Sequence, residues 1–110
     1  MKVSINIQAG ICGFETTVTA CGSGVKEPTL IEIESNCEKI IALGESVREV
    51  RGLDEITRGF DGVIMSEARN VLRGCCAGCV VPAGIFKATQ VASELALPKD
   101  ILISMTKEEE

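Results

Sequence analysis

One stretch of this sequence joins its last two predicted helices: Gly74-Cys75-Cys76-Ala77-Gly78-Cys79-Val80-Val81-Pro82. It holds three of the six cysteines of the chain within five residues. Pro82 suits the first turn of the longest predicted helix, because its missing N–H would have no partner there in any case. The 110 residues include no histidine, so a metal site would have to be built from cysteine, with carboxylates as the other available ligands. We therefore expect the chemistry of this chain to be cysteine chemistry.

Upstream of this stretch, alternating apolar and polar residues predict three strands. Val3, Ile5 and Ile7 share one face of the first strand, and residues 14–21 and 29–34 alternate in the same way. The second strand is most simply paired with the first as a hairpin. The three strands together would form an antiparallel meander.

Helical spacing predicts the rest of the fold. A first helix begins with a capping-box pattern at Ser35 and carries apolar residues as far as Val50, a second covers about 63–73, and the longest ends before Pro98. The apolar run Ile101–Met105 predicts a last strand inside the sheet. The order β-β-β-α-α-α-β predicts an α+β fold of two layers, with a mixed sheet and its helices on one face.

Length and composition predict one α/β domain over residues 1–106 and a charged flexible tail over 107–110. With 45% hydrophobic and 25% charged residues, the composition is that of a globular protein. A formal net charge of −5 provides no basic surface, so neither nucleic acid nor an anionic membrane is an expected partner. A protein partner and a homodimer stay open. Without a signal-like start or an apolar run of about 20 residues, we expect a cytoplasmic protein.

A conditional argument brings most of the cysteines together. In a meander, the first and third strands end at the same edge of the sheet, so Cys12 and Cys37 would meet there. A last strand parallel to these two would bring the 75–79 loop to that edge as well. Cys21, at the far end of the second strand, falls outside the group. The predicted metal ligands are Cys12, Cys37, Cys75, Cys76 and Cys79.

Thiolates at this edge would suit a metal. Cys37 in the first turn of one predicted helix and Cys79 ahead of another would feel the positive end of a helix dipole, which favours the thiolate. Cys76 and Cys79 form a CxxC pair, whose spacing lets two sulfurs reach one ion at about 2.3 Å. With Cys12 and Cys37, and with Cys75 as the alternative to Cys76, such a site could hold Zn²⁺ or an iron–sulfur cluster.

Two other interpretations remain open at this point. Cys76 and Cys79 could cycle between dithiol and disulfide at a helix start, as redox proteins do. Alternatively, all the cysteines could be small buried residues without chemistry, because free cysteine is among the most buried residue types. The pattern predicts no catalytic and no organic-cofactor residue, and it leaves open whether the protein is an enzyme.

Several segments resemble a small family of unknown function from anaerobic archaea and bacteria. The segments that carry the resemblance are Ala9–Phe14, Ser35–Cys37, Cys79–Ala88 and Leu95–Asp100. Its most specific part is the Cys-x-x-Pro helix start with the Ala-Leu-Pro-Lys-Asp exit. The resemblance implies a cytosolic protein of oxygen-poor cells. It also implies that the motif cysteines are Cys12, Cys37 and Cys79, with a fourth at Cys75 or Cys76.

Overall fold

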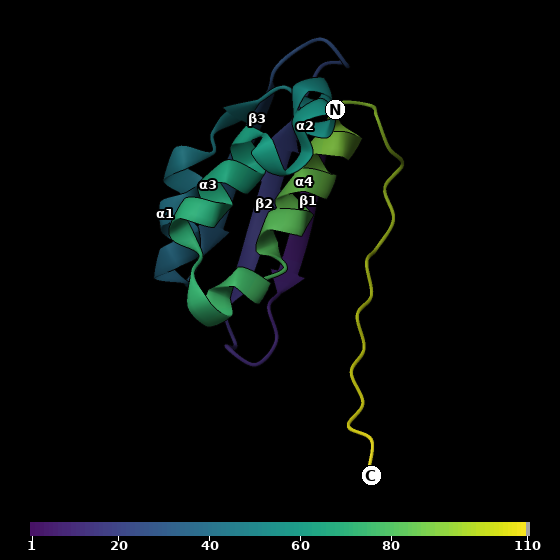
Figure 1. Ribbon diagram of the computed structural model, residues 1–110. Coiled ribbons are helices and arrows are strands. Elements are labelled where there is room, and N and C mark those ends of the chain that lie inside the picture. Colours follow the sequence, from purple (N-terminus) through teal and green to yellow (C-terminus); the bar gives the residue numbers. More distant parts are fainter. Residues whose placement is uncertain (110) are drawn as a thin grey trace.

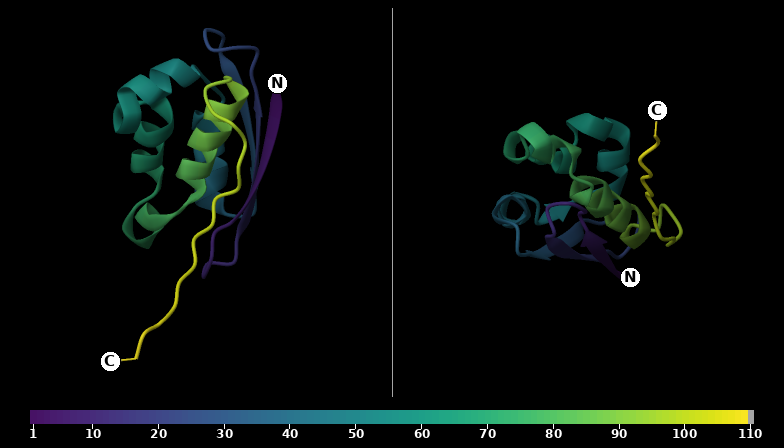
Figure 2. Two further views of the ribbon diagram at one scale, coloured as in Figure 1. Left: turned by 90° about the vertical axis from the view of Figure 1, so that its right-hand side faces the viewer. Right: turned by 90° about the horizontal axis from the view of Figure 1, so that it is seen from below.

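The computed structural model describes residues 1–109 and has two layers, a sheet and a layer of helices that covers one of its faces (Figures 1 and 2). The strands are β1 (Lys2–Gln8), β2 (Glu15–Cys21), β3 (Thr29–Ser35) and β4 (Glu49–Val50). The helices are α1 (Glu38–Ser46), α2 (Gly52–Arg58), α3 (Val63–Val71) and α4 (Val81–Ala92), with the 3₁₀ helices η1 (Gly59–Asp61) and η2 (Gly74–Gly78). The predicted α+β class is confirmed.

The three predicted strands are confirmed, and their alternation places the core. The sheet order is β1-β2-β3-β4. In the central strand β2, Thr16, Val18 and Ala20 are buried, whereas the ends Glu15 and Cys21 are exposed. The buried residues face the helix layer because successive side chains of a strand point to opposite faces. The opposite face of the sheet is mostly polar, with Lys2, Ser4, Asn6 and Gln8 in β1 and Glu32 and Glu34 beside the exposed Leu30 in β3.

The predicted mixed sheet is wrong, because every strand pair in the described part of the chain is antiparallel. The predicted last strand at Ile101–Met105 is wrong as well: these residues form no strand and are exposed. An apolar run shows that a segment has surface to bury, but it does not show that the partner lies in the same sheet. Lys107–Glu109 are also exposed and irregular, and Glu110, the last residue of the predicted tail, lies outside the described residues.

The two long predicted helices are shorter than expected. Val50 lies in β4, because the chain leaves α1 at Val47 and pairs briefly with β3. The predicted capping box does not form, since Cys37 is the N-cap of α1 and makes no side-chain cap hydrogen bond. α4 ends at Ala92 rather than before Pro98. Just after Ala92, the Leu95 N–H donates back to the Gln90 carbonyl at 2.8 Å and closes the helix end.

The helix α4 lies across β1 and β2 and contributes much of the core. Ile85, Ala88 and Ala92 are fully buried on its sheet side. By length and composition alone, Gly74–Ala92 could cross a membrane. A core helix passes the same test, and in this stretch η2 and α4 are separate helices, so we interpret α4 as the core helix of the fold.

Candidate thiol site

The turn between β1 and β2 places Cys12 at one end of the sheet. The Gly13 N–H donates to the Gly10 carbonyl at 2.9 Å and closes a four-residue turn. Gly10 and Gly13 have φ angles of 97° and 75°, in the left-handed region that glycine adopts without a steric cost. The Cys12 side chain is exposed, so the turn presents this thiol at the surface.

The strand β3 brings Cys37 to the same end of the sheet. The Cys37 N–H donates to Ser35 Oγ at 3.1 Å as the chain turns into α1. Beside it, Asn36 Oδ1 accepts the N–H of Glu15, the first residue of β2, at 3.0 Å. This bond ties the start of α1 to the base of the β1–β2 hairpin. The Cys37 side chain is half-buried and packs against the core.

The direction of α4 brings the remaining cysteines to this end (Figure 1). α4 packs on β1 and β2 and starts beside the end of β1. Gly84 in its first turns lies so close to Ile7 that a Cβ at Gly84 would collide with the Ile7 side chain. The 3₁₀ helix η2, which directly precedes α4, therefore lies beside the hairpin and the start of α1 (Figures 1 and 2).

The structure distinguishes the two adjacent cysteines of η2. Cys76 is half-buried and packs against the core, and its Sγ accepts a hydrogen bond from Lys39 Nζ at 3.6 Å. Cys75 is exposed. The Cys79 N–H donates to the Cys76 carbonyl at 3.1 Å. Because a 3₁₀ helix has three residues per turn, Cys76 and Cys79 lie on its same side, and Cys75 does not.

The surroundings of Cys79 raise the pKa of its thiol. Burial is the largest cause and raises the pKa of this thiol, because burial disfavours the thiolate. The backbone N–H of Val81 acts in the opposite direction, and negative charge on Cys12, Cys37 and Cys76 raises the pKa further. We call these four residues the thiol cluster: Cys12, Cys37, Cys76 and Cys79.

The expected net lowering of the Cys79 pKa is therefore wrong, although the Val81 N–H at the start of α4 does act in that direction. The one backbone N–H that favours the thiolate is outweighed by burial and by the neighbouring thiols. In the absence of a cation, like charges in a partly buried group oppose ionisation. Ionisation of Cys79 is thus disfavoured unless positive charge is added nearby.

The thiol cluster is not closed into a ligand set. Over residues 1–109, no three His, Cys, Asp or Glu side chains stand in position to hold a metal ion. All six cysteines are free thiols. The effect of the neighbouring thiols on the Cys79 pKa is compatible with the absence of a metal-ready ligand set among the described residues. Charges interact over longer distances than the roughly 2.3 Å of a metal–sulfur bond. The four thiols are neighbours without being in coordination distance.

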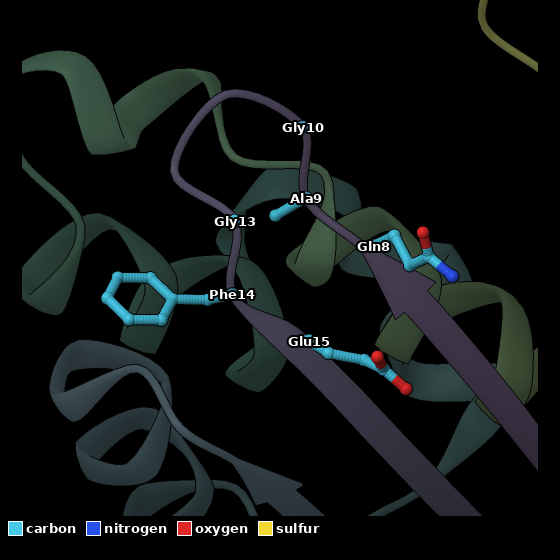
Figure 3. A pocket seen from close by; sticks show the side chains of 6 residues that line it. All are labelled: Gln8, Ala9, Gly10, Gly13, Phe14 and Glu15. Atoms are coloured by element: carbon cyan, nitrogen blue, oxygen red, sulfur yellow. The ribbon is translucent and has the colours of Figure 1, made fainter.

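A shallow pocket of about 310 Å³ lies at the hairpin (Figure 3). Phe14 and Glu15 point to opposite sides of the strand that borders it (Figure 3). Phe14 is on the same side of the strand as the buried Thr16, which faces the helix layer, and its ring is 40% exposed. Gln8 and Glu15 supply the polar groups of the pocket on the other side.

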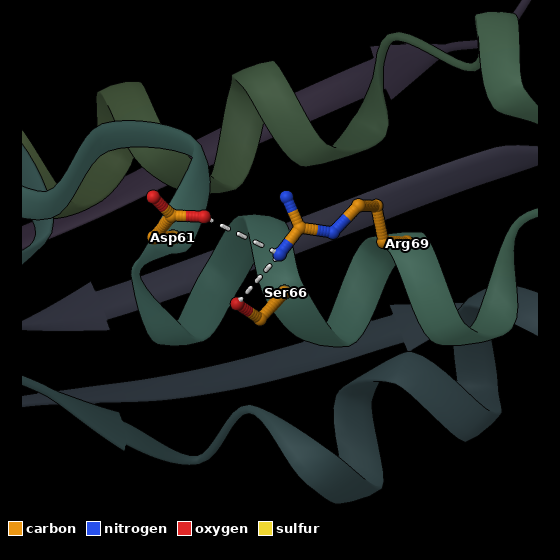
Figure 4. A network of polar contacts seen from close by, with 3 residues as sticks. All are labelled: Asp61, Ser66 and Arg69. Carbon is orange, nitrogen blue, oxygen red and sulfur yellow. Dashed lines mark hydrogen bonds and ion pairs between the residues drawn. The ribbon is translucent and has the colours of Figure 1, made fainter.

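The side-chain contacts of Arg69 in α3 lie on the protein surface. Arg69 Nη2 lies 3.7 Å from Asp61 Oδ1 and 3.3 Å from Ser66 Oγ (Figure 4). The side chains of Arg69 and Asp61 are 59% and 87% exposed. An exposed pair of this kind contributes at most about 1 kcal/mol. We therefore interpret it as a surface contact rather than a binding site.

Sequence reasoning missed two partners of the thiol cluster. Lys39 reaches Cys76 from α1, and the Val81 N–H favours the Cys79 thiolate. Lys39 lies two residues after Cys37, at the start of the same helix. This proximity of a lysine to a predicted ligand was the signal in the sequence that could have identified Lys39. Cys21, by contrast, is exposed at the last residue of β2, where it pairs with Lys2 at the opposite end of the sheet.

Comparison with known proteins adds a family but no activity. A family model described as a family of unknown function (DUF6951) matches residues 3–105. No curated protein and no solved structure is significantly similar to the chain. The match includes all four positions of the thiol cluster and the exposed run Ile101–Met105. A function must therefore be argued from the residues of this chain.

Proposed function

The chain belongs to the DUF6951 family of unknown function, and from this premise we propose that the thiol cluster is an all-cysteine metal site. The bound group is Zn²⁺ or an iron–sulfur cluster, because both accept four thiolates without histidine. Its role is structural, sensing or carrying, and no reaction is assigned to it. In this proposal the protein works in the cytoplasm, where a reducing environment keeps thiols free.

The observation that carries the proposal is the convergence of thiols from separate parts of the fold. The hairpin turn, the N-cap of α1 and η2 each contribute, and three of the four side chains are half-buried. A core that only needed small apolar residues would have no reason to gather thiols at one end of the sheet. Soft thiolates gathered in this way are typical ligands of Zn²⁺ and of iron–sulfur clusters.

The charges around the cluster also support metal binding. Four thiolates around a divalent cation leave a net negative site, and the Lys39 ammonium at 3.6 Å from Cys76 Sγ would offset part of it. The Val81 N–H favours the Cys79 thiolate, as outer hydrogen bonds to metal ligands commonly do. A bound cation reverses the like-charge repulsion that raises the pKa of Cys79, so metal binding would release protons.

Closing the site requires the thiols to move closer together, and the hairpin turn is the part of the cluster least held by packing. Cys12 is exposed, and its neighbour Ile11 is fully exposed. Cys37, Cys76 and Cys79 are instead packed against the core. We therefore propose that movement of Cys12 on its turn closes the site, together with smaller side-chain adjustments of the three packed thiols, which are not yet in position to share one ion.

Metal content of matched cysteine variants tests the proposal. Protein purified without oxygen and loaded with zinc or with iron and sulfide should hold a stoichiometric metal centre. Cys76→Ser should weaken metal binding by roughly tenfold or more, since even an outer-sphere substitution costs that much, whereas Cys75→Ser should leave it unchanged. Cys21→Ser is the second control. An iron–sulfur cluster would colour the protein, and zinc would appear only in elemental analysis.

Two outcomes would overturn the metal site. Equal effects of Cys75→Ser and Cys76→Ser would show that the inward position of Cys76 does not matter. A wild-type chain that stays metal-free in both loadings, and whose Cys76 and Cys79 reversibly lose two hydrogens on mild oxidation, would support the thiol–disulfide alternative. The raised pKa of Cys79 makes this residue a poor attacking thiol, so in that alternative Cys76 would attack.

A further inference from the structure

Two features of the molecule lack a partner: the outer edge of β1 and the exposed run Ile101–Met105, here called the tail segment. β1 pairs with β2 on one side, and no strand of residues 1–109 covers its other side. The tail segment lies outside the body of the fold (Figures 1 and 2). We propose that the tail segment of one chain adds as a strand to the β1 edge of a second copy, so that two copies exchange tail segments.

The tail segment has the composition of a strand and the exposure of a free peptide. Leu102, Ile103 and Met105 are 87%, 64% and 92% exposed. Apolar surface of this extent favours burial by about 25 cal/mol per Å², and β-branched residues favour strands. The segment is also within the range matched by the family model, which ends at residue 105. The match therefore treats these residues as part of the domain.

Hydrogen bonding shows which backbone groups the β1 edge offers. The terminal ammonium of Met1 donates to the Gly22 carbonyl, and the Gly22 N–H donates back to the Met1 carbonyl. At the other end of the ladder the Ala9 N–H donates to the Phe14 carbonyl. Hydrogen-bonded and non-bonded positions alternate along an antiparallel pair, so the odd-numbered residues of β1 bond to β2. The backbone groups of its even-numbered residues, among them Ser4, point to the open edge.

The core beneath this edge is incompletely covered. Val18 and Ala20 of β2 are fully buried, whereas their β1 partners Ile5 and Val3 are only half-buried. A strand added beside β1 would cover these two side chains. In such a strand, Ile101, Ile103 and Met105 share one face and Leu102 and Ser104 the other. The more apolar face would continue the core.

The course of the chain favours a second copy over the same chain. The tail leaves α4 beside the beginning of β1, since the Ala92 carbonyl packs against Gly22 next to Met1. From there the tail, as far as residue 109, runs alongside the body and past its far end without pairing with its own β1 (Figures 1 and 2). The molecule accordingly extends 50 Å along its longest axis against 26 and 24 Å along the others. Reciprocal exchange would cover both free edges at once in a closed two-fold dimer, and main-chain bonds to an open edge are a common mode of association.

Two matched pairs of variants of the full chain test the exchange by light scattering after size exclusion. Wild type should be a dimer. Ser4→Pro removes an outward N–H without touching the bonds to β2 and should yield monomer, whereas Ser4→Ala should stay dimeric. Ile103→Asp places a charge on the core face and should weaken the dimer roughly a hundredfold, whereas Ser104→Asp on the other face should not.

Several results would overturn the exchange. These are a monomeric wild-type chain at micromolar concentration, a dimer that survives both Ser4→Pro and Ile103→Asp, or a monomer whose tail amides are protected from hydrogen exchange. The last result would place the tail segment on its own β1. Because Ile103 is exposed in the single chain, loss of the dimer in Ile103→Asp cannot arise from unfolding. The test is independent of the thiol cluster and is repeated with a metal chelator present.

Discussion

At the scale of single residues, adjacent cysteines have different surroundings. Cys76 packs against the core and accepts a hydrogen bond from Lys39, and Cys75 is exposed. The sequence could not distinguish them, because either spacing to Cys79 reaches one metal ion. The distinction comes from η2. A 3₁₀ helix has three residues per turn, so Cys76, three positions before Cys79, lies on the same side as Cys79.

Glu55 is a buried carboxylate with a structural role. It is 2% exposed, and its two oxygens accept the N–H groups of Val63 and Ile64 at 3.0 and 2.8 Å. Gly62, the N-cap of α3, has no side chain to do this. Glu55→Ala should lower the free energy of unfolding by about 2–4 kcal/mol, because it removes two hydrogen bonds to a charged group and leaves two N–H groups unpaired. Urea denaturation measures the change.

The control for Glu55 is an exposed glutamate on another helix. Glu45 in α1 is exposed and is not among the capping residues, so Glu45→Ala should change the free energy of unfolding by no more than about 0.5 kcal/mol. If both variants lost the same small amount, the capping role of Glu55 would be refuted. The metal content of Glu55→Ala should match wild type, because Glu55 lies outside the thiol cluster.

At the scale of elements, the end of α4 shows the limit of helix signals in the sequence. Pro98 predicts a helix up to the preceding residue, but α4 ends at Ala92. The closing turn has the bonds of a Schellman motif, from Leu95 N–H to the Gln90 carbonyl and from Glu94 N–H to Val91. Glu94 has a φ of 63° there, where glycine is usual. Without that glycine, the sequence does not mark the end.

Replacing Glu94 by glycine should stabilise the protein. A non-glycine residue in the left-handed region costs roughly 1 kcal/mol, and Glu94 is exposed, so little packing is lost. Glu94→Gly should therefore raise the free energy of unfolding by up to about 1 kcal/mol. Thermal denaturation followed by circular dichroism measures the gain.

Glu94→Ala is the matched control, because alanine removes the side chain but keeps the left-handed strain. It should show no gain over wild type. An equal gain in Glu94→Ala and Glu94→Gly would mean that the glutamate side chain, rather than its backbone conformation, is the unfavourable feature.

The strands were more predictable than the helix ends. Alternation of period two in residues 2–8, 15–21 and 29–35 depends only on one face being buried, and the structure confirms all three strands. The tail segment shows the converse. Its apolar run predicts burial, but these residues are exposed in the single chain. In the exchange proposed above, a second molecule would bury them, and a single sequence does not reveal such a partner.

At the scale of the whole molecule, the cysteines of the cluster come together for a reason other than the one predicted. The argument from sequence required a last strand parallel to β1, and that strand is absent from the sheet. The helix α4 supplies the same connection, because it packs across β1 and β2 and starts beside the hairpin. The meander that places Cys12 and Cys37 at one edge was predictable from turns and alternation, but the packing of α4 was not.

The whole fold also separates a fixed part of the thiol cluster from a movable part. Cys37, Cys76 and Cys79 rest on the core, which the sheet and helices hold together. Cys12 sits on a turn whose glycines tolerate other backbone conformations. A metal ion that binds only the closed form of the site would stabilise that form, and the hairpin that carries Cys12 would be held in place with it.

X-ray absorption at the K edge of the bound metal tests the central claim most directly, because it counts the sulfur atoms around that metal. The account predicts four sulfur neighbours at about 2.3 Å in wild type, and three with one oxygen or nitrogen in Cys12→Ser. Cys75→Ser should leave the four-sulfur shell intact. A shell dominated by oxygen or nitrogen, or a wild-type protein that holds no metal after anaerobic loading, would contradict it.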